Sequence, residues 1–257
     1  MYASKSLFLI AAAAVALTAA EAPYAGKWKM NPAKSDFGET TVTYEQLNSG
    51  EIQGTADGLT FKFKTDGKDY PNPWGGTGAW KSVNANTWTV EQKINGKLVT
   101  TDTMTVSADG KTLTVNSKGT KPNGEAIDDT TVMQRVSGAS GLFGKWKTKN
   151  LKSSSPSVLE LTPVGTDGLT IKVVDINMTC ECKFDGKDHA CSGPTLGAGW
   201  TVVLSKSGAN GFEMTSKKDG KALYKSTYAV SADGKTLTES GGATGTAEKY
   251  KAVYDKQ

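Results

Sequence analysis

Arginine and histidine are nearly absent from this chain. Every basic residue is a lysine except Arg135, and the only histidine is His189. Sites for nucleic acids and phosphates favour the planar guanidinium group, and they need positive charge gathered on one face. Here the lysines are scattered along the sequence, many of them in turn motifs. We therefore predict a solubilising lysine surface and no nucleic-acid partner.

Recognisable catalytic motifs are also missing. The sequence has no Gly-x-Ser-x-Gly element and no glycine-rich phosphate loop. Seven of the fifteen aspartates precede glycine in expected turns, where the carboxylate caps its own backbone. Asp128 and Asp129 are adjacent on an expected strand, so their side chains point to opposite faces. No nucleophile and base can be paired, and we predict a protein that is not an enzyme.

Long hydrophobic runs are lacking as well. The one apolar stretch, Leu7 to Leu17, covers about eleven residues, whereas a membrane-spanning helix needs roughly twenty. Lys5 precedes it and small residues follow it, the pattern of a secretory signal peptide. We predict a signal peptide over residues 1–20, no membrane span, and a periplasmic or extracellular mature protein.

Two copies of one module make up the rest of the chain. Gly26-Lys27-Trp28-Lys29 recurs at 144–147, and the eight residues 107–114 recur without change at 231–238. The offset between the copies grows only from 118 to 124. Such long matches in the same order indicate an internal repeat. We predict domains at 24–137 and 144–257, joined by a linker at 138–143.

Turn chemistry predicts the secondary structure of each copy. Asp-Gly and Asn-Gly pairs recur between stretches of alternating apolar and polar residues, and they supply the positive φ angles of tight hairpins. No stretch of the mature chain has a sustained helical period. The predicted fold is all-β: two tandem, small, antiparallel up-and-down barrels of about eight to ten strands each, since closure removes exposed sheet edges.

Two hairpins predict specific registers. A two-residue turn at Asp109-Gly110 pairs Val106 with Leu113 and Met104 with Val115, which places four apolar side chains on one face. A three-residue loop at 95–97 pairs Ile94 with Leu98 and Trp88 with Met104.

The ends of each copy resemble the lipocalin and fatty-acid-binding superfamily. Each copy begins with Gly-x-Trp (Trp28, Trp146) and ends with a cation on its last strand (Arg135, Lys256). In that superfamily the tryptophan closes the floor of the barrel and the cation packs over it, so the resemblance implies these roles here. It also implies a calyx that holds a small hydrophobic molecule. The chain lacks room for the helices that flank or cover such barrels.

The second copy has an unusual cluster of polar and sulfur-containing side chains. Its members, which replace Phe61, Phe63, Tyr70 and Asn72 of the first copy, are Cys180, Cys182, His189 and Cys191. A two-residue turn at Asp185-Gly186 would set Cys180 opposite Cys191 and Cys182 opposite His189, whereas a shifted turn would pair Cys182 with Cys191. Three interpretations remain: a disulfide from Cys191 to Cys180 or Cys182, a four-ligand zinc or copper site, or thiols buried as small hydrophobes.

The first copy is rich in aromatic residues that could contact a ligand. The candidate ligand-binding residues are Phe61, Phe63, Tyr70, Trp74, Trp80 and Trp88. A small barrel either fills its interior with such side chains or leaves a cavity lined by them. Trp74 lies in a Pro- and Gly-rich loop, which places it at the expected mouth.

Three functions are compatible with these features. The first is a binding protein that holds a small hydrophobic or aromatic ligand inside a barrel, without a cofactor. The second is a structural or protein-interaction module with fully packed barrels. The third is a metal-binding or redox role for the cluster in the second copy.

Overall fold

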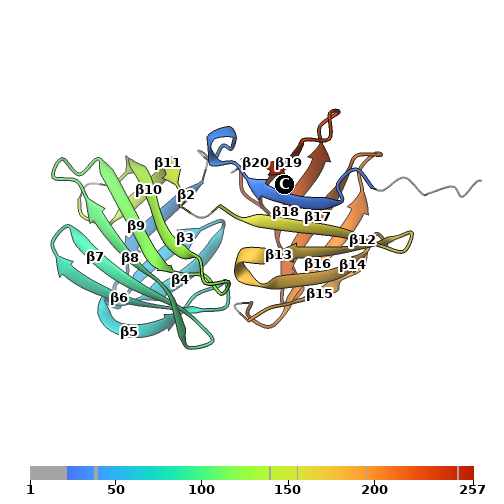
Figure 1. Cartoon of the computed structure of the whole chain (residues 1–257). Helices are drawn as coiled ribbons and strands as arrows, with labels where there is room; N and C mark the ends of the chain where they lie inside the picture. Colours follow the sequence, from blue (N-terminus) through green and yellow to red (C-terminus); the bar gives the residue numbers. More distant parts are fainter. Residues whose placement is uncertain (1–21, 38–39, 139, 155, 195, 248) are drawn as a thin grey trace, which may run out of the picture.

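The computed structural model describes residues 22–257 except 38–39, 139, 155, 195 and 248. The predicted signal peptide at 1–20 lies outside the described residues. The described chain is all-β, as predicted, and consists of two antiparallel sheets of ten strands each (Figure 1). The helices in the described part are two short 3₁₀ segments, η1 (Pro32–Lys34) and η2 (Val174–Ile176), and neither is long enough to cross a bilayer.

The first sheet, here called barrel 1, is curved but open between its two end strands, β4 and β5. Its strands, in spatial order, are β4 (Leu59–Phe63), β3 (Ile52–Ala56), β2 (Thr41–Gln46), β11 (Gly144–Lys152), β10 (Ala126–Ser137), β9 (Thr112–Thr120), β8 (Lys97–Val106), β7 (Thr87–Ile94), β6 (Thr77–Asn84) and β5 (Asp66–Pro71).

The second sheet, barrel 2, is a closed barrel. Its strands, in spatial order, are β1 (Gly26–Met30), β12 (Val158–Val164), β13 (Gly168–Val173), β14 (Met178–Lys183), β15 (His189–Ser192), β16 (Trp200–Lys206), β17 (Gly211–Lys218), β18 (Lys221–Val230), β19 (Thr236–Ala243) and β20 (Tyr250–Lys256), which pairs with β1.

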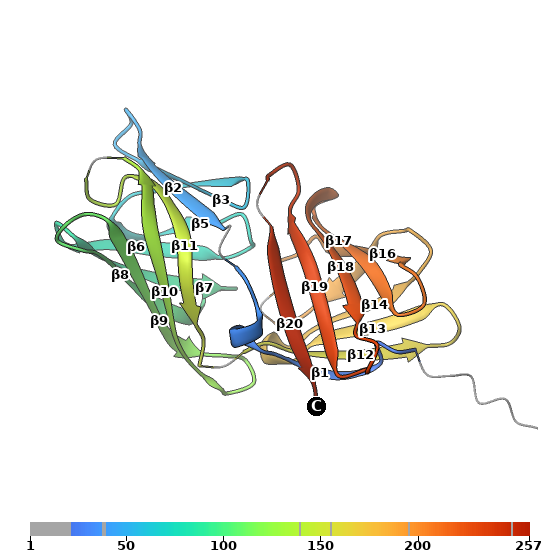
Figure 2. The same ribbon diagram turned by 90° about the horizontal axis from the view of Figure 1, so that it is seen from above.

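The two copies exchange their first strands. The N-terminal strand β1 lies in barrel 2, between β12 and β20, and β11 of the second copy lies in barrel 1, between β2 and β10 (Figures 1 and 2). The loop between β10 and β11 therefore connects two strands of barrel 1, and the chain passes from barrel 2 to barrel 1 between β1 and β2 and back between β11 and β12. The barrels divide the chain differently from the sequence copies at 24–137 and 144–257.

Each exchanged strand buries a tryptophan in the core of the barrel it joins. Trp28 and Trp146 are fully buried, and their indole N–H groups donate to the carbonyls of Tyr24 and Leu142. The Arg135 guanidinium lies 4.0 Å from the centre of the Trp146 ring, and the Lys256 ammonium lies 5.2 Å from that of Trp28. These are cation–π contacts, and each joins a cation to the tryptophan of the other sequence copy.

The predicted registers hold for three of four pairs. Val106 faces Leu113, Met104 faces Val115 and Trp88 faces Met104. The predicted pairing of Ile94 with Leu98 is wrong, because Asn95-Gly96 forms a two-residue turn that sets Ile94 opposite Lys97. A bulge between Gln92 and Lys93 then restores the predicted pairing of Trp88 with Met104. The third residue that the prediction assigned to the turn therefore lies in the strands instead.

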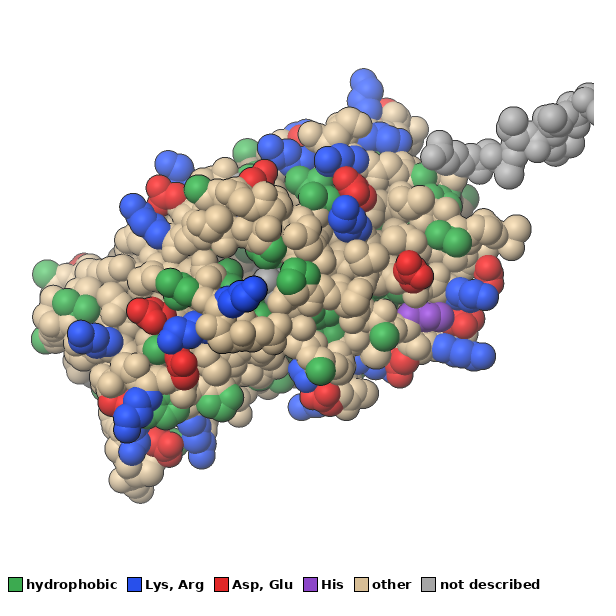
Figure 3. All heavy atoms as spheres, turned by 60° about the horizontal axis from the view of Figure 1, so that its bottom comes forward, with side chains coloured by type: hydrophobic (Ala, Val, Ile, Leu, Met, Phe, Trp, Pro, Cys, Tyr) green, Lys and Arg blue, Asp and Glu red, His purple; other side chains and the backbone are tan. Residues whose placement is uncertain are grey.

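Charges of both signs are interspersed over the face of the molecule in Figure 3.

Many of the aspartates fulfil the turn role predicted for them: Asp109 and Asp233 each accept from the backbone N–H two residues on. Hydrogen bonds from the hydroxyls of Ser107 and Ser231, followed by these backbone hydrogen bonds, hold the pKa of both carboxyls below its usual value.

Candidate functional site

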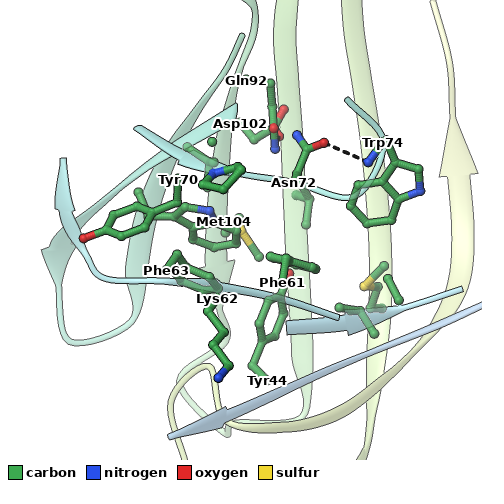
Figure 4. Close-up of a pocket in the computed structure, with 18 residues that line it drawn as sticks. Tyr44, Phe61, Lys62, Phe63, Tyr70, Asn72, Trp74, Gln92, Asp102 and Met104 are labelled. Carbon is green, nitrogen blue, oxygen red and sulfur yellow. Dashed lines mark hydrogen bonds between the residues drawn. The ribbon is translucent and has the colours of Figure 1, made fainter. Parts of the chain in front are cut away.

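A cavity of about 430 Å³ opens in barrel 1, and aromatic side chains form much of its wall (Figure 4). Of the six candidate ligand-binding residues, those that line it are Phe61, Phe63, Tyr70, Trp74 and Trp80. Trp88 is instead buried in the apolar core of the same barrel, opposite Met104 in the β7–β8 ladder. The wall is completed by apolar side chains from β2 and β7–β10: Val42, Val90, Met104, Val115 and Met133.

The aromatic wall is a continuous set of ring contacts. Phe63 and Trp80 stack with their ring centres 3.9 Å apart, and Tyr44 meets Trp80 edge-on at 5.8 Å. Phe61 stacks on Phe63 at 5.9 Å. Sequence reasoning missed Tyr44. Its alternation with Val42 on β2 placed it on an inward face, but only the sheet order brings β2 opposite β6.

A glycine makes room for Phe61. Gly54 lies opposite Phe61 in the β3–β4 ladder, and a Cβ atom at position 54 would overlap the Phe61 ring. The far end of the ring therefore occupies the space that a side chain at position 54 would fill. The equivalent pair in barrel 2 is Ile171 and Cys180, so a small and a large side chain have traded places between the barrels.

One carboxylate lines the cavity. Asp102, on β8, accepts a hydrogen bond from Gln92 Nε2 at 3.2 Å. Burial raises the pKa of Asp102, although hydrogen bonds from Ser117, Gln92 and Thr100 act in the opposite direction. The pKa of Tyr44 is also raised, first by burial and then by the negative charge of Asp102.

The loop after β5 forms the rim of the cavity, and Asn72 fixes its shape. The Asn72 side-chain oxygen accepts from the backbone N–H of Trp74 at 3.0 Å (Figure 4). It also accepts from the backbone N–H of Gly76 at 3.1 Å. The Trp74 indole N–H donates to the hydroxyl of Tyr224, in barrel 2, at 3.1 Å, and that hydroxyl donates to Asp57 at 3.0 Å. Trp74 is thus half-buried and held by the neighbouring barrel.

The interior of barrel 2 is filled at the positions that leave space in barrel 1. The ladders align Met104, Val115 and Met133 with larger or polar residues, namely Tyr228, Glu239 and Tyr254. Glu239 is buried and accepts from the hydroxyls of Tyr250 and Tyr254, at 2.5 and 2.9 Å. Burial, followed by the charge of Glu239, raises the pKa of both tyrosines.

A disulfide joins the two strands of barrel 2 that correspond to the open edges of barrel 1. Cys180 on β14 is bonded to Cys191 on β15, as one of the predicted pairings required, and the alternative of Cys182 with Cys191 is wrong. In barrel 1 the equivalent strands β4 and β5 do not pair, and Phe61 and Asn72 occupy the cysteine positions.

The other two members of the predicted metal cluster are Cys182 and His189, and neither belongs to the disulfide. Cys182 is buried, and burial raises its pKa to about 11, so its thiol stays protonated at neutral pH. His189 Nε2 lies 2.8 Å from a carboxylate oxygen of Asp185. The disulfide removes two of the four predicted ligands, and no three acidic, cysteine or histidine side chains in the described ranges are arranged to hold a metal ion.

Comparison with known proteins adds no family assignment. The chain matches no protein-family model, and no curated protein sequence matches it either.

Proposed function

We propose that the protein binds a small apolar or aromatic ligand in the cavity of barrel 1. The observation that carries this proposal is the cavity itself, about 430 Å³ in volume and walled by stacked aromatic rings. Small-molecule sites are typically apolar concavities of roughly 300–1,000 Å³ with a few polar groups that orient the ligand. Asp102, Gln92 and Asn72 are such groups.

Export to a periplasm or to the exterior fits this role. The sequence pattern of residues 1–20 predicts a signal peptide, and the Cys180–Cys191 disulfide is of the kind that persists in oxidising compartments. A lipocalin-like ancestry is part of the proposal. It is supported by the buried tryptophans with their cations and by the antiparallel barrels, whose strand order is sequential apart from the exchanged strands.

Tryptophan fluorescence tests the proposal, because Trp80 and Trp74 line the cavity. Titration with a panel of aromatic and aliphatic compounds should give saturable quenching. Met133→Tyr, which introduces the residue found at the equivalent position of barrel 2, should fill the cavity and abolish the effect. Val136→Tyr is the matched control, since Val136 lies on the same strand but is 57% exposed. Saturable quenching that survives Met133→Tyr would place the ligand elsewhere.

A second candidate function, a structural or interaction role, applies to barrel 2. Its interior is packed by Tyr228, Glu239 and Tyr254, and it donates Tyr224 to the rim of the cavity in barrel 1. Barrel 2 would then support the rim without holding a ligand. If the panel binds with unchanged stoichiometry after Met133→Tyr, this assignment of roles is wrong.

A further inference from the structure

The charge of the cavity wall restricts the ligand further, if the proposed function holds. The two charged residues that line the cavity are Asp102 and Lys62. Lys62 alternates with the inward-facing Phe61 and Phe63 on β4, and its side chain is exposed. Asp102 is therefore the charged group that a ligand inside the cavity meets.

Asp102 has neutral partners only. Its hydrogen bonds come from an amide, Gln92, and from the hydroxyls of Ser117 and Thr100. Among the residues that the structure describes, no lysine or arginine forms an ion pair with it, whereas the half-buried Lys121 and the buried Asp175 elsewhere in the molecule pair at 3.3 Å. A carboxylate in a largely apolar cavity without a cation is costly, and a cationic ligand would offset that cost.

The neighbouring aromatic rings favour the same ligand charge. Tyr44, Phe61, Phe63 and Trp80 pack into one wall of the cavity that Asp102 also lines. Aromatic faces carry negative electrostatic potential and attract ammonium groups, most strongly when these are desolvated. Clusters of aromatic rings are a common means of recognising quaternary ammonium groups.

We propose that barrel 1 binds a small organic cation, a protonated or quaternary amine with an apolar or aromatic substituent. The ammonium group lies against Asp102, and the apolar substituent lies against the wall formed by Phe61, Phe63 and Trp80. An anionic ligand such as a carboxylate is disfavoured, because it would bring a second negative charge next to Asp102 in a site of low dielectric constant.

Three probes of similar size separate ligand charge from ligand shape. Benzyltrimethylammonium is the cation, neopentylbenzene is its neutral carbon isostere, and 4-phenylbutyrate is an anion. Their affinities for the full chain are measured by tryptophan quenching and calorimetry. The cation should bind at least about tenfold more tightly than the isostere, a difference that corresponds to about 1.4 kcal/mol, and the anion should bind most weakly.

The variant Asp102→Asn keeps the shape of the site and removes the charge. It should weaken binding of the cation about tenfold or more and leave the affinity for neopentylbenzene unchanged. Asp128→Asn, an exposed position on β10, is the control for the change in net charge and should alter neither affinity.

The outcomes distinguish the two proposals. Equal or tighter binding of the neutral isostere by the native protein would overturn the cation proposal and leave the binding function intact, even if Asp102→Asn failed to fold. Undiminished cation binding by a folded Asp102→Asn would also overturn it. If none of the three probes bound, both the cation proposal and the proposed function would lose their support.

Discussion

Equivalent positions in the two barrels hold side chains of different size and polarity. Barrel 1 has Met104, Val115 and Met133 around an aromatic cavity, whereas barrel 2 fills the same space with two tyrosines and a buried glutamate. Barrel 1 is open between β4 and β5, and barrel 2 is closed there by a disulfide. One repeat thus supports two outcomes, a barrel with an accessible interior and a barrel with a filled one.

The barrel whose sheet is closed is also the one whose interior is filled, and the barrel whose sheet is open has the cavity. In barrel 2, β14 pairs with β15, and the small side chains of Cys180 and Cys191 are bonded to each other there. The bulky Phe61 at the equivalent position of β4 lies over Gly54 and contacts the rim residue Trp74, with ring centres 5.8 Å apart. The open edges of barrel 1 therefore coincide with the rim of its cavity.

The largest effect is expected at the exchanged strands. Trp28→Ala should destabilise barrel 2, and Trp146→Ala should destabilise barrel 1, each by about 3–5 kcal/mol, the usual cost of deleting a fully buried aromatic side chain. Hydrogen exchange resolved by peptide identifies which barrel loses protection. Loss of protection in β2–β10 after Trp28→Ala would contradict the strand exchange.

Removal of the disulfide should affect barrel 2 selectively. The double variant Cys180→Ala/Cys191→Ala opens a loop with a sequence separation of 11 residues and should lower the free energy of unfolding by about 2–3 kcal/mol. Denaturant unfolding monitored for each barrel measures it. Cys182→Ala, which deletes a buried thiol outside the disulfide, is the control and should cost less. Equal losses in both barrels would show that the disulfide does not act locally.

The buried network of tyrosines and Glu239 should contribute less to the free energy of unfolding than the disulfide does. Tyr254→Phe removes a donor 2.9 Å from Glu239 and leaves the buried carboxylate less well satisfied. The expected loss of unfolding free energy is about 1–3 kcal/mol. Tyr70→Phe, which removes an exposed hydrogen bond to Asp66, is the comparison and should have little effect on stability. A Tyr254→Phe protein as stable as the parent would indicate that Glu239 is satisfied by other groups.

The smallest effect concerns the link between the barrels. Tyr224→Phe, in barrel 2, removes the hydroxyl that receives the Trp74 indole N–H, so the rim of the cavity in barrel 1 should lose one restraint. Ligand affinity should fall by the equivalent of one hydrogen bond, about 0.5–1.5 kcal/mol. Trp74→Phe combined with Tyr224→Phe should show less than the sum of the two single changes, and full additivity would argue against the contact.

The sequence by itself determined the repeat, the all-β class, the hairpin registers around Met104 and Leu113, and a set of cysteines that included the disulfide pair. These features depend on local turn chemistry and on period-two alternation, which act within a few residues of the chain. The aromatic residues of the first copy were also evident, and five of the six candidates line the cavity.

Only the tertiary structure decided which barrel each first strand joins, and which barrel keeps its interior free. β1 and β11 carry the same Gly-Lys-Trp-Lys motif, so their local preferences cannot distinguish one barrel from the other. Contacts between residues distant in sequence determine which barrel each strand joins. One of them is the hydrogen bond from Asn31 to Asp255 beside the end of β1. Likewise, whether a ring fills a barrel or lines a cavity depends on the sizes of side chains from several strands together.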